Sequence, residues 1–198
     1  MTERLVLRCW EPRDAPALKE AVDASLDHLR PWMPWALAEP QSLDEKVALL
    51  RTFRGRFDLG QDYVLGIFSR DESEVVGGSG FHTRVGDEAF EIGYWIRASR
   101  AGEGLGTEAT AALTRVGFEV CGVDRIEIRV EPQNERSAAI PRKLGYEEEA
   151  LLRRRLRHPA APEPRDAIVF SLFRDRYEET VSSSAPVEAY DALGSRVL

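Results

Sequence analysis

The stretch that decides the fold is residues 90–120, FEIGYWIRASRAGEGLGTEATAALTRVGFEV. It begins with alternating residues typical of a strand and ends with apolar residues at helical spacing. Between the two, Gly102, Gly104 and Gly106 leave the backbone amides of residues 102–107 uncovered by side chains. A helix that starts there adds its own unpaired amides and the positive end of its dipole. The stretch therefore predicts a cradle for an anion, most naturally a phosphate or pyrophosphate.

Length and composition restrict the class of protein. A chain of 198 residues with 43% hydrophobic and 31% charged residues fits one globular domain with a sizeable core. Its net charge of -7 argues against nucleic acid or an anionic membrane as the main partner. There is no secretory signal and no apolar stretch near the ~20 residues of a membrane span, so we expect a cytoplasmic protein.

The remaining chain predicts an α+β order of elements. Alternating segments predict the following strands: 4–10, 62–70, 74–83, 88–97, 125–130, 146–157 and 166–173. Helical spacing predicts the following helices: one that starts near 11–14, then 42–58, 104–121 and 134–144. Asp14 is the expected N-cap of the first helix, and apolar Leu18, Val22 and Leu26 follow along one face. Ser42 and Glu45 have the spacing of a capping box.

Three segments are expected to lack regular structure. Prolines interrupt residues 28–40 and residues 158–165, which predicts loops in both places. Residues 180–198 are rich in small and polar residues, so we expect a mobile or loosely docked tail after a single domain over residues 1–179.

The glycine-rich turn has several interpretations. Residues 104–109 match the G-x-G-x-x-A form of a dinucleotide-binding turn, with Asp124 or Glu127 about 20 residues further on. The predicted antiparallel strands before the turn argue against that fold, and a P-loop is excluded because no Gly-Lys-Ser/Thr closes the turn. A purely structural turn and a coenzyme A pyrophosphate site are the alternatives.

Three motifs carry a resemblance to a known family. They are IGYWI at 92–96 with AGEGLGTEA at 101–109, NERS at 134–137 with KLGY at 143–146, and HLRPWMPW at 28–35. With them the chain resembles the GNAT superfamily of N-acetyltransferases, in the branch that acetylates the N-termini of ribosomal proteins (the RimJ/RimL type). The resemblance extends from residue 4 to about residue 177. The chain departs from the superfamily pattern at Ala101, where Gln or Arg is usual, and Arg100 stands one residue earlier.

The resemblance implies a GNAT fold of the α/β (α+β) class. Its sheet is mixed, mostly antiparallel and seven-stranded, is splayed at two central parallel strands, 88–97 and 125–130, and has helices on both faces. The pantetheine arm of acetyl-CoA would lie in the gap as an added strand. The residues implied to bind the coenzyme are Trp95, Ile96, Arg97, Arg100, Ala101, Gly102, Glu103, Gly104, Leu105, Gly106, Thr107, Asn134, Ser137 and Lys143.

The implied reaction is direct attack of an amine on the thioester, which needs proximity and a way to remove the amine proton. Glu91 is the candidate base, with Glu88 beside it; a water chain, or a merely solvated Glu91, are the alternatives. Strand alternation puts Glu91, Gly93 and Trp95 on one face and Tyr94 on the other.

Many members of the superfamily use a tyrosine as the acid, and that position here is Pro141. The resembled branch suggests Ser137 in its place, as a hydrogen-bond donor to the thiol sulfur or to pantetheine. Asn134 combines an N-cap with a pantetheine ligand, and Tyr146 is expected in the core. Cys9, Cys121 and the three histidines show no metal spacing, so no metal is expected.

The acceptor side is the least determined. In the resembled branch the loop with Trp32, Met33 and Trp35 covers the acceptor pocket, and a satellite hydrophobic cluster is the alternative. Arg153, Arg155 and Arg157 are expected on one solvated strand face, with recognition of an acidic acceptor or of the coenzyme 3′-phosphate as the alternative. The resemblance implies an enzyme that acetylates a protein N-terminal α-amine, and a homodimer is compatible with it.

Other activities stay open at this point. The acceptor could be a small-molecule amine, and the donor could be succinyl-CoA or another acyl-CoA. Because the usual tyrosine is missing and Ala101 departs from the pattern, a non-catalytic acyl-CoA-binding module is the alternative of a different class.

Overall fold

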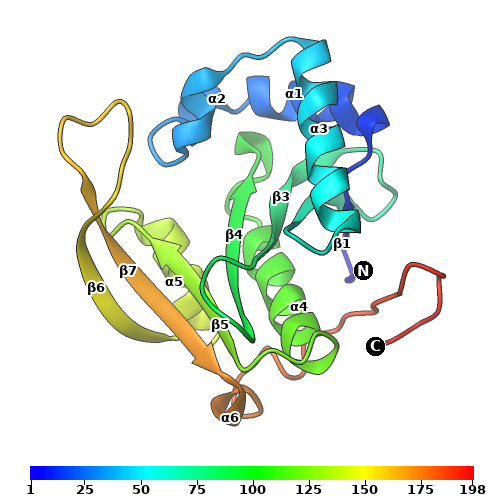
Figure 1. The fold of residues 1–198 in the computed structure, drawn as a ribbon, viewed down its shortest axis with the longest axis vertical. Helices are drawn as coiled ribbons and strands as arrows, with labels where there is room; N and C mark the ends of the chain where they lie inside the picture. Colours follow the sequence, from blue (N-terminus) through cyan, green and yellow to red (C-terminus); the bar gives the residue numbers. More distant parts are fainter.

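A seven-stranded sheet runs through the computed structural model, which describes residues 1–198 (Figure 1). The strands are β1 (Leu5–Cys9), β2 (Tyr63–Ser69), β3 (Val75–His82), β4 (Ala89–Ile96), β5 (Arg125–Val130), β6 (Glu147–Leu156) and β7 (Arg165–Phe173). The helices are α1 (Ala15–Asp23), α2 (Leu26–Leu29), α3 (Leu43–Asp58), α4 (Leu105–Glu119), α5 (Glu135–Lys143) and α6 (Arg174–Tyr177). The strand order is β1-β2-β3-β4-β5-β7-β6, and only the β4–β5 pair is parallel.

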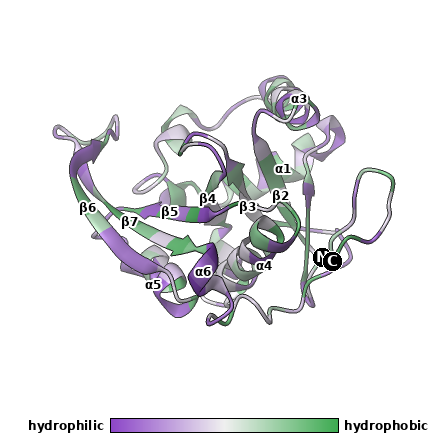
Figure 2. Ribbon diagram, turned by 60° about the horizontal axis from the view of Figure 1, so that its bottom comes forward, coloured by the Kyte–Doolittle hydropathy of each residue, from purple (hydrophilic) through white to green (hydrophobic).

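Helices cover both faces of the sheet. Figure 2 shows α1 and α3 over one face and α4 and α5 over the other. The core on the α4 side includes Phe81, Ile92 and Phe118, and the core on the α1 side includes Trp10 and Leu50. The predicted GNAT fold is confirmed. None of the helices has the length and apolar character that crossing a bilayer requires.

The two parallel strands separate after a short contact. Their ladder consists of Ala89↔Arg125, Phe90↔Ile126 and Glu91↔Glu127. Beyond it, β4 continues to pair with β3 as far as Ile96, and β5 continues to pair with β7 as far as Val130. A gap therefore opens in the middle of the sheet toward the carboxyl ends of both strands, as the splayed sheet of the prediction requires.

The hydrogen bonds between β4 and β3 determine which backbone groups of β4 face this gap. The amide of Arg97 donates to the Val76 carbonyl at 2.9 Å, so Arg97 pairs with β3. Because backbone groups of a strand alternate between its two neighbours, Trp95 also turns its amide and carbonyl toward β3. The backbone groups of Tyr94 and Ile96 then point into the gap without a strand partner.

Two local predictions near the N-terminus differ from the structure. Asp14 occupies the N-cap position of α1 as predicted, but its side chain makes no capping bond, because its carboxylate accepts from the Glu11 amide at 2.9 Å and from Arg8 at 2.7 Å. The first helix ends at Asp23, and Leu26 belongs to the separate helix α2.

The predicted loop at 28–40 contains a 3-10 helix, Pro34–Ala38. The capping box of α3 is confirmed, since Glu45 and Ser42 bond reciprocally.

The arginine run of β6 is exposed but does not alternate as predicted. Arg154 has a φ of +56°, and the register with β7 shifts between Leu152 and Leu156. This irregularity interrupts the single face expected for Arg153, Arg155 and Arg157, none of which forms an ion pair.

The tail makes specific contacts with the domain. The Met1 ammonium donates to the Glu188 carbonyl at 2.5 Å, and Arg115 donates to the Ala185 carbonyl at 2.9 Å. The N- and C-terminal ends of the chain consequently lie near each other (Figure 1). The domain limit at residue 179 and the mobility of the tail stay predictions.

The loop at residues 30–41 is held from two sides. On the β6–β7 side, His158 Nε2 lies 2.8 Å from the Arg30 carbonyl and Arg165 donates to the Pro31 carbonyl at 2.8 Å. On the α3 side, Lys46 forms a buried ion pair with Glu39.

This buried pair generates a stability prediction. Lys46→Ala leaves the Glu39 carboxylate buried without its partner, so we expect the free energy of unfolding to fall by about 3–5 kcal/mol. Chemical denaturation monitored by tryptophan fluorescence measures the loss. The double variant Lys46→Met with Glu39→Gln removes both charges and should lose less; an equal or larger loss in the double variant would contradict the assignment.

Candidate functional site

The predicted anion cradle forms at the start of α4. Gly102 and Gly104 have φ angles of +88° and +80°, a left-handed conformation that strains any residue with a Cβ. The amide of Glu108 donates to the Gly104 carbonyl at 3.0 Å, so the amides of residues 105–107 precede the helical ladder and have no partner in it. A Cβ on Gly106 would lie 3.1 Å from Ile140 Cδ1, which shows how closely α4 packs on α5.

Charged side chains surround the cradle but are paired among themselves. Arg100 forms ion pairs with Glu74 and Glu103. Arg4, which the sequence did not single out, pairs with Glu108 at 2.6 Å and donates to the Glu103 carbonyl at 3.0 Å. A phosphate at the cradle would therefore compete with carboxylates for these guanidinium groups, and backbone amides are the donors that stand free.

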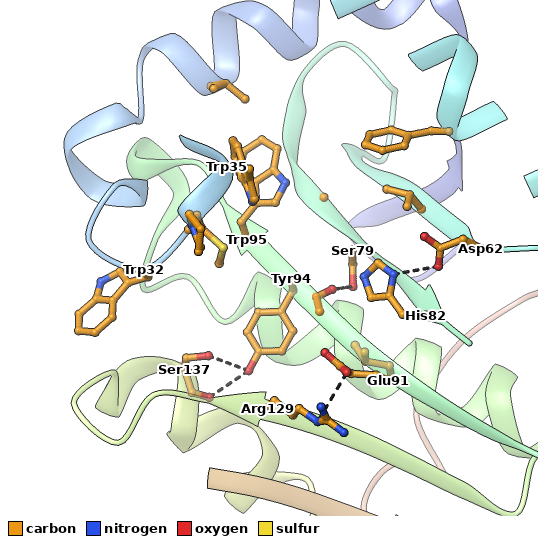
Figure 3. Close-up of a pocket in the computed structure, with 18 of the residues that line it drawn as sticks. Trp32, Trp35, Asp62, Ser79, His82, Glu91, Tyr94, Trp95, Arg129 and Ser137 are labelled. Carbon is orange, nitrogen blue, oxygen red and sulfur yellow. Dashed lines mark hydrogen bonds and ion pairs between the residues drawn. The ribbon is translucent and has the colours of Figure 1, made fainter. Parts of the chain in front are cut away.

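A pocket of about 850 Å³ occupies the gap and extends beneath the loop of residues 30–41 (Figure 3). The predicted site residues that line it are Trp32, Met33, Trp35, Glu91, Trp95, Asn134 and Ser137. Trp35 packs edge-to-face on Trp95 with ring centroids 5.9 Å apart. The residues of the cradle lie outside this pocket, and so does Lys143, which is exposed at the far end of α5.

Tyr94 is a lining residue that the sequence did not single out as a site residue. Its hydroxyl donates to the Ser137 carbonyl at 3.0 Å and accepts from Ser137 Oγ at 3.2 Å (Figure 3). Pro141 explains the first bond, because it stands four residues after Ser137 and has no N–H to bond that carbonyl. Burial raises the pKa of Tyr94 to about 12, so the hydroxyl keeps its proton at neutral pH. Alternation placed Tyr94 on the face of β4 opposite to Glu91. Its side chain lines the pocket because β4 and β5 separate beside it.

Tyr146, by contrast, is a core residue, as predicted. It is buried, and its hydroxyl lies 2.6 Å from Thr114 Oγ. Burial raises the pKa of Tyr146 strongly.

Glu91 lies in the pocket but is already engaged. Its side chain is 7% exposed. One oxygen accepts from Arg84 Nη2, and the other accepts from Arg84 Nε at 3.0 Å and lies 3.6 Å from Arg129 Nε. Such a bidentate pair fixes the carboxylate in place.

Asp62 and His82 form a second polar pair in the pocket. His82 Nδ1 lies 2.9 Å from Asp62 Oδ1 (Figure 3). Neither residue was a predicted site residue. The register of the β2–β3 hairpin sets the two residues opposite each other. The sequence predicted this hairpin, so pairing its two strands residue by residue could have found the pair.

The fold, the free amides at the start of α4 and the pocket in the splayed sheet define an acyltransferase that uses an acyl-CoA donor. The chain belongs to the acetyltransferase (GNAT) domain family, whose model matches residues 4–147. It is an acetyl-CoA-dependent acetyltransferase of this type.

Several relatives are similar over most of the chain. The Bacillus subtilis (strain 168) N-acetyltransferase YoaA is 28% identical over 88% of this chain and 96% of its own. The [ribosomal protein uS5]-alanine N-acetyltransferase of Escherichia coli (strain K12) is 29% identical over 75% of this chain and 77% of its own. Among solved structures, Mycobacterium smegmatis RimJ in complex with CoA-disulfide has a TM-score of 0.80 and 26% identity, over 90% of this chain and 86% of its own.

The bond between Tyr94 and Ser137 can be tested by a double-mutant cycle. Tyr94→Phe leaves the Ser137 carbonyl without a donor, so we expect a loss of about 1 kcal/mol in the free energy of unfolding. In a Pro141→Ala background the alanine amide supplies the missing donor, and the same Tyr94→Phe change should cost less. Denaturant midpoints of the four proteins measure the coupling; strictly additive losses would contradict it.

Proposed function

We propose that this acetyltransferase transfers the acetyl group of acetyl-CoA to the N-terminal α-amine of a protein. The observation that carries the proposal is that one pocket joins the gap between β4 and β5 to the space beneath the tryptophan loop. A donor laid in the gap thus meets an acceptor inserted under the loop. The similarity to a uS5-alanine N-acetyltransferase supports a protein N-terminus as the acceptor.

The donor is held mainly by backbone groups. The free amides of residues 102–107 hold the pyrophosphate at the positive end of α4, so Ala101 does not prevent binding. The backbone of Tyr94 and Ile96 binds pantetheine as an added strand would, with Trp95 and Arg97 flanking it through their side chains. The remaining predicted coenzyme residues, including Lys143, keep the roles implied by the resemblance as part of this proposal.

The start of α5 holds the reacting end of the donor. Asn134 Oδ1 accepts from the Ser137 amide at 3.2 Å, which leaves the Asn134 side-chain N–H groups for a pantetheine carbonyl. When the amine attacks the thioester carbon, the carbon–sulfur bond breaks and its electron pair stays on sulfur. The Ser137 hydroxyl then turns its proton from the Tyr94 oxygen to the thiolate, in place of the tyrosine that Pro141 replaces, while Tyr94 keeps its bond to the Ser137 carbonyl.

The acceptor enters beneath Trp32, Met33 and Trp35. These apolar side chains contact the first residue of the acceptor and exclude water from the thioester. In this proposal Glu91 either accepts the amine proton or positions Arg84 and Arg129. A homodimer and a cytoplasmic location stay predictions.

A thiol-release assay with acetyl-CoA tests the proposed acceptor. We expect release with a peptide that begins with alanine and none with the same peptide acetylated at its N-terminus. The blocked peptide also contains a lysine, whose ε-amine is the control: no release with it shows that a side-chain amine does not replace the N-terminal α-amine. Release only with a polyamine or an aminoglycoside would replace the proposed acceptor by a small molecule, and tight coenzyme binding without release on any amine would leave a binding module.

The cradle can be tested with two glycines at opposite ends of α4. Gly104→Val places a branched side chain over the free amides, so we expect coenzyme A to bind at least ~10-fold more weakly, about 1.4 kcal/mol. Gly122 has a similar φ of +74° and no atom within 4 Å of its Cβ position, which makes Gly122→Val a control for backbone strain. Calorimetric titration of both variants should separate them; equal affinities would refute the cradle.

A further inference from the structure

Three neighbouring strands bring Asp62, His82 and Glu91 into one row. In the register, His82 pairs with Glu91 across β3 and β4, and Tyr63 pairs with Phe81 across β2 and β3. Asp62 directly precedes Tyr63 and therefore faces His82. Side chains of paired residues project from the same face of a sheet, so all three lie on the α1 side, where the pocket is.

The bond between His82 and Asp62 determines the tautomer of the imidazole. A carboxylate can only accept, so the hydrogen bond of 2.9 Å to Asp62 Oδ1 places the proton on His82 Nδ1. In the neutral imidazole the other ring nitrogen, Nε2, is then an acceptor with its lone pair available. A histidine base can be oriented in this way by a half-buried carboxylate.

His82 Nε2 lies where an acceptor amine can reach it. It is 3.5 Å from the position that a Cβ would take on Gly93, so the missing side chain of Gly93 leaves space in front of the imidazole. Gly93 directly precedes Tyr94, whose hydroxyl marks the proposed position of the thioester sulfur. The imidazole and that hydroxyl project from opposite faces of the sheet and line the same pocket (Figure 3).

His82 also borders a second hollow. A hollow of about 240 Å³ is lined by Arg56, Gln61, Asp62, His82, Thr83 and Arg84 and by no apolar residue. His82 belongs to both cavities and keeps 23% of its side chain exposed. The imidazole can take up a proton from the pocket and release it to water in the hollow.

We propose that His82, oriented by Asp62, takes the proton from the acceptor ammonium, and that Glu91 positions Arg84 and Arg129. This inference rests on the proposed transfer to an amine and names the group that activates it. Glu91 is less suited to the task because both of its oxygens already accept from Arg84.

The step balances as follows. The ammonium gives one proton to His82 Nε2, which passes it to water in the hollow. The neutral amine nitrogen bonds to the thioester carbon, the carbon–sulfur bond breaks, and the second proton of the nitrogen goes to the departing sulfur. The products are the acetylated amine, the free thiol of coenzyme A and one proton in solution.

Other charged groups face the imidazole from each neighbouring element. They are Asp62 before β2, Arg84 after β3, Glu91 on β4, Arg129 on β5 and Arg56 on α3. The test therefore varies pH and compares variants of several of them.

The experiment measures kcat/KM between pH 6 and pH 9.5 with acetyl-CoA and the alanine peptide. His82→Gln should lower kcat/KM by ~100-fold or more near pH 7, with most of the loss in kcat. Above pH 8 the α-amine is largely neutral without a base, so the deficit should shrink to less than ~10-fold at pH 9.5. A merely structural role of His82 would give the same deficit at every pH.

Three further variants sharpen the comparison. Asp62→Asn should reproduce part of the His82→Gln loss with the same pH dependence, because the imidazole loses its orienting carboxylate. Glu91→Gln should lower the rate by a factor that does not depend on pH. His28→Gln changes a histidine outside the pocket and should leave the profile unchanged. A pH-dependent loss in Glu91→Gln and none in His82→Gln would overturn the proposal.

A second measurement needs no acceptor. In nitrogen-15 NMR spectra of the histidine rings, His82 of the wild type should carry its proton on Nδ1, and Asp62→Asn should shift that proton toward Nε2. A proton on Nε2 in the neutral wild-type enzyme would overturn the proposal. If the wild type does not acetylate the alanine peptide, the proposed acceptor fails, and the tautomer alone decides the role of His82.

Discussion

The hydrogen-bond ladder between β4 and β5 stops after Glu91↔Glu127, and the site depends on this separation. Each strand keeps its outer neighbour, so the sheet stays intact while the inner backbone groups of β4 lose a strand partner. Unpaired backbone groups in a protein interior are costly, and an extended ligand that pairs with them removes the cost. In the proposed complex the coenzyme completes a sheet that the chain alone leaves open.

A substitution in one element is compensated by a residue in another. Pro141 removes both the usual tyrosine and the N–H that would bond the Ser137 carbonyl. Tyr94 reaches across the gap from β4 and supplies a hydroxyl to that carbonyl. The same hydrogen bond that satisfies the helix therefore holds a phenol beside Ser137, at the start of α5. Motif comparison alone showed the loss and could not show the compensation.

The sequence predicted the seven strands, the glycine-rich turn at the start of α4 and the tryptophan loop, because glycine spacing, alternation and the family motifs are local signals. It did not predict the partners of charged side chains, which depend on the positions of distant strands. Glu91 was expected as a base or as a solvated strand residue, and its carboxylate is held by Arg84. Asp14 was expected as a helix cap, and Arg8 on the neighbouring strand takes its carboxylate instead. Asp62 and His82 are 20 residues apart, and only the hairpin register makes them a pair.

The loop at residues 30–41 has one more consequence. It is tied to α3 by Glu39 and Lys46 and to the β6–β7 hairpin by His158 and Arg165. For the proposed acceptor, a loop held along two edges favours end-on entry over the approach of a bulky surface. A free chain terminus can thread beneath it, whereas an amine in the middle of a folded surface is kept out by shape. The selection between these amines then depends on steric access and requires no difference in their chemistry.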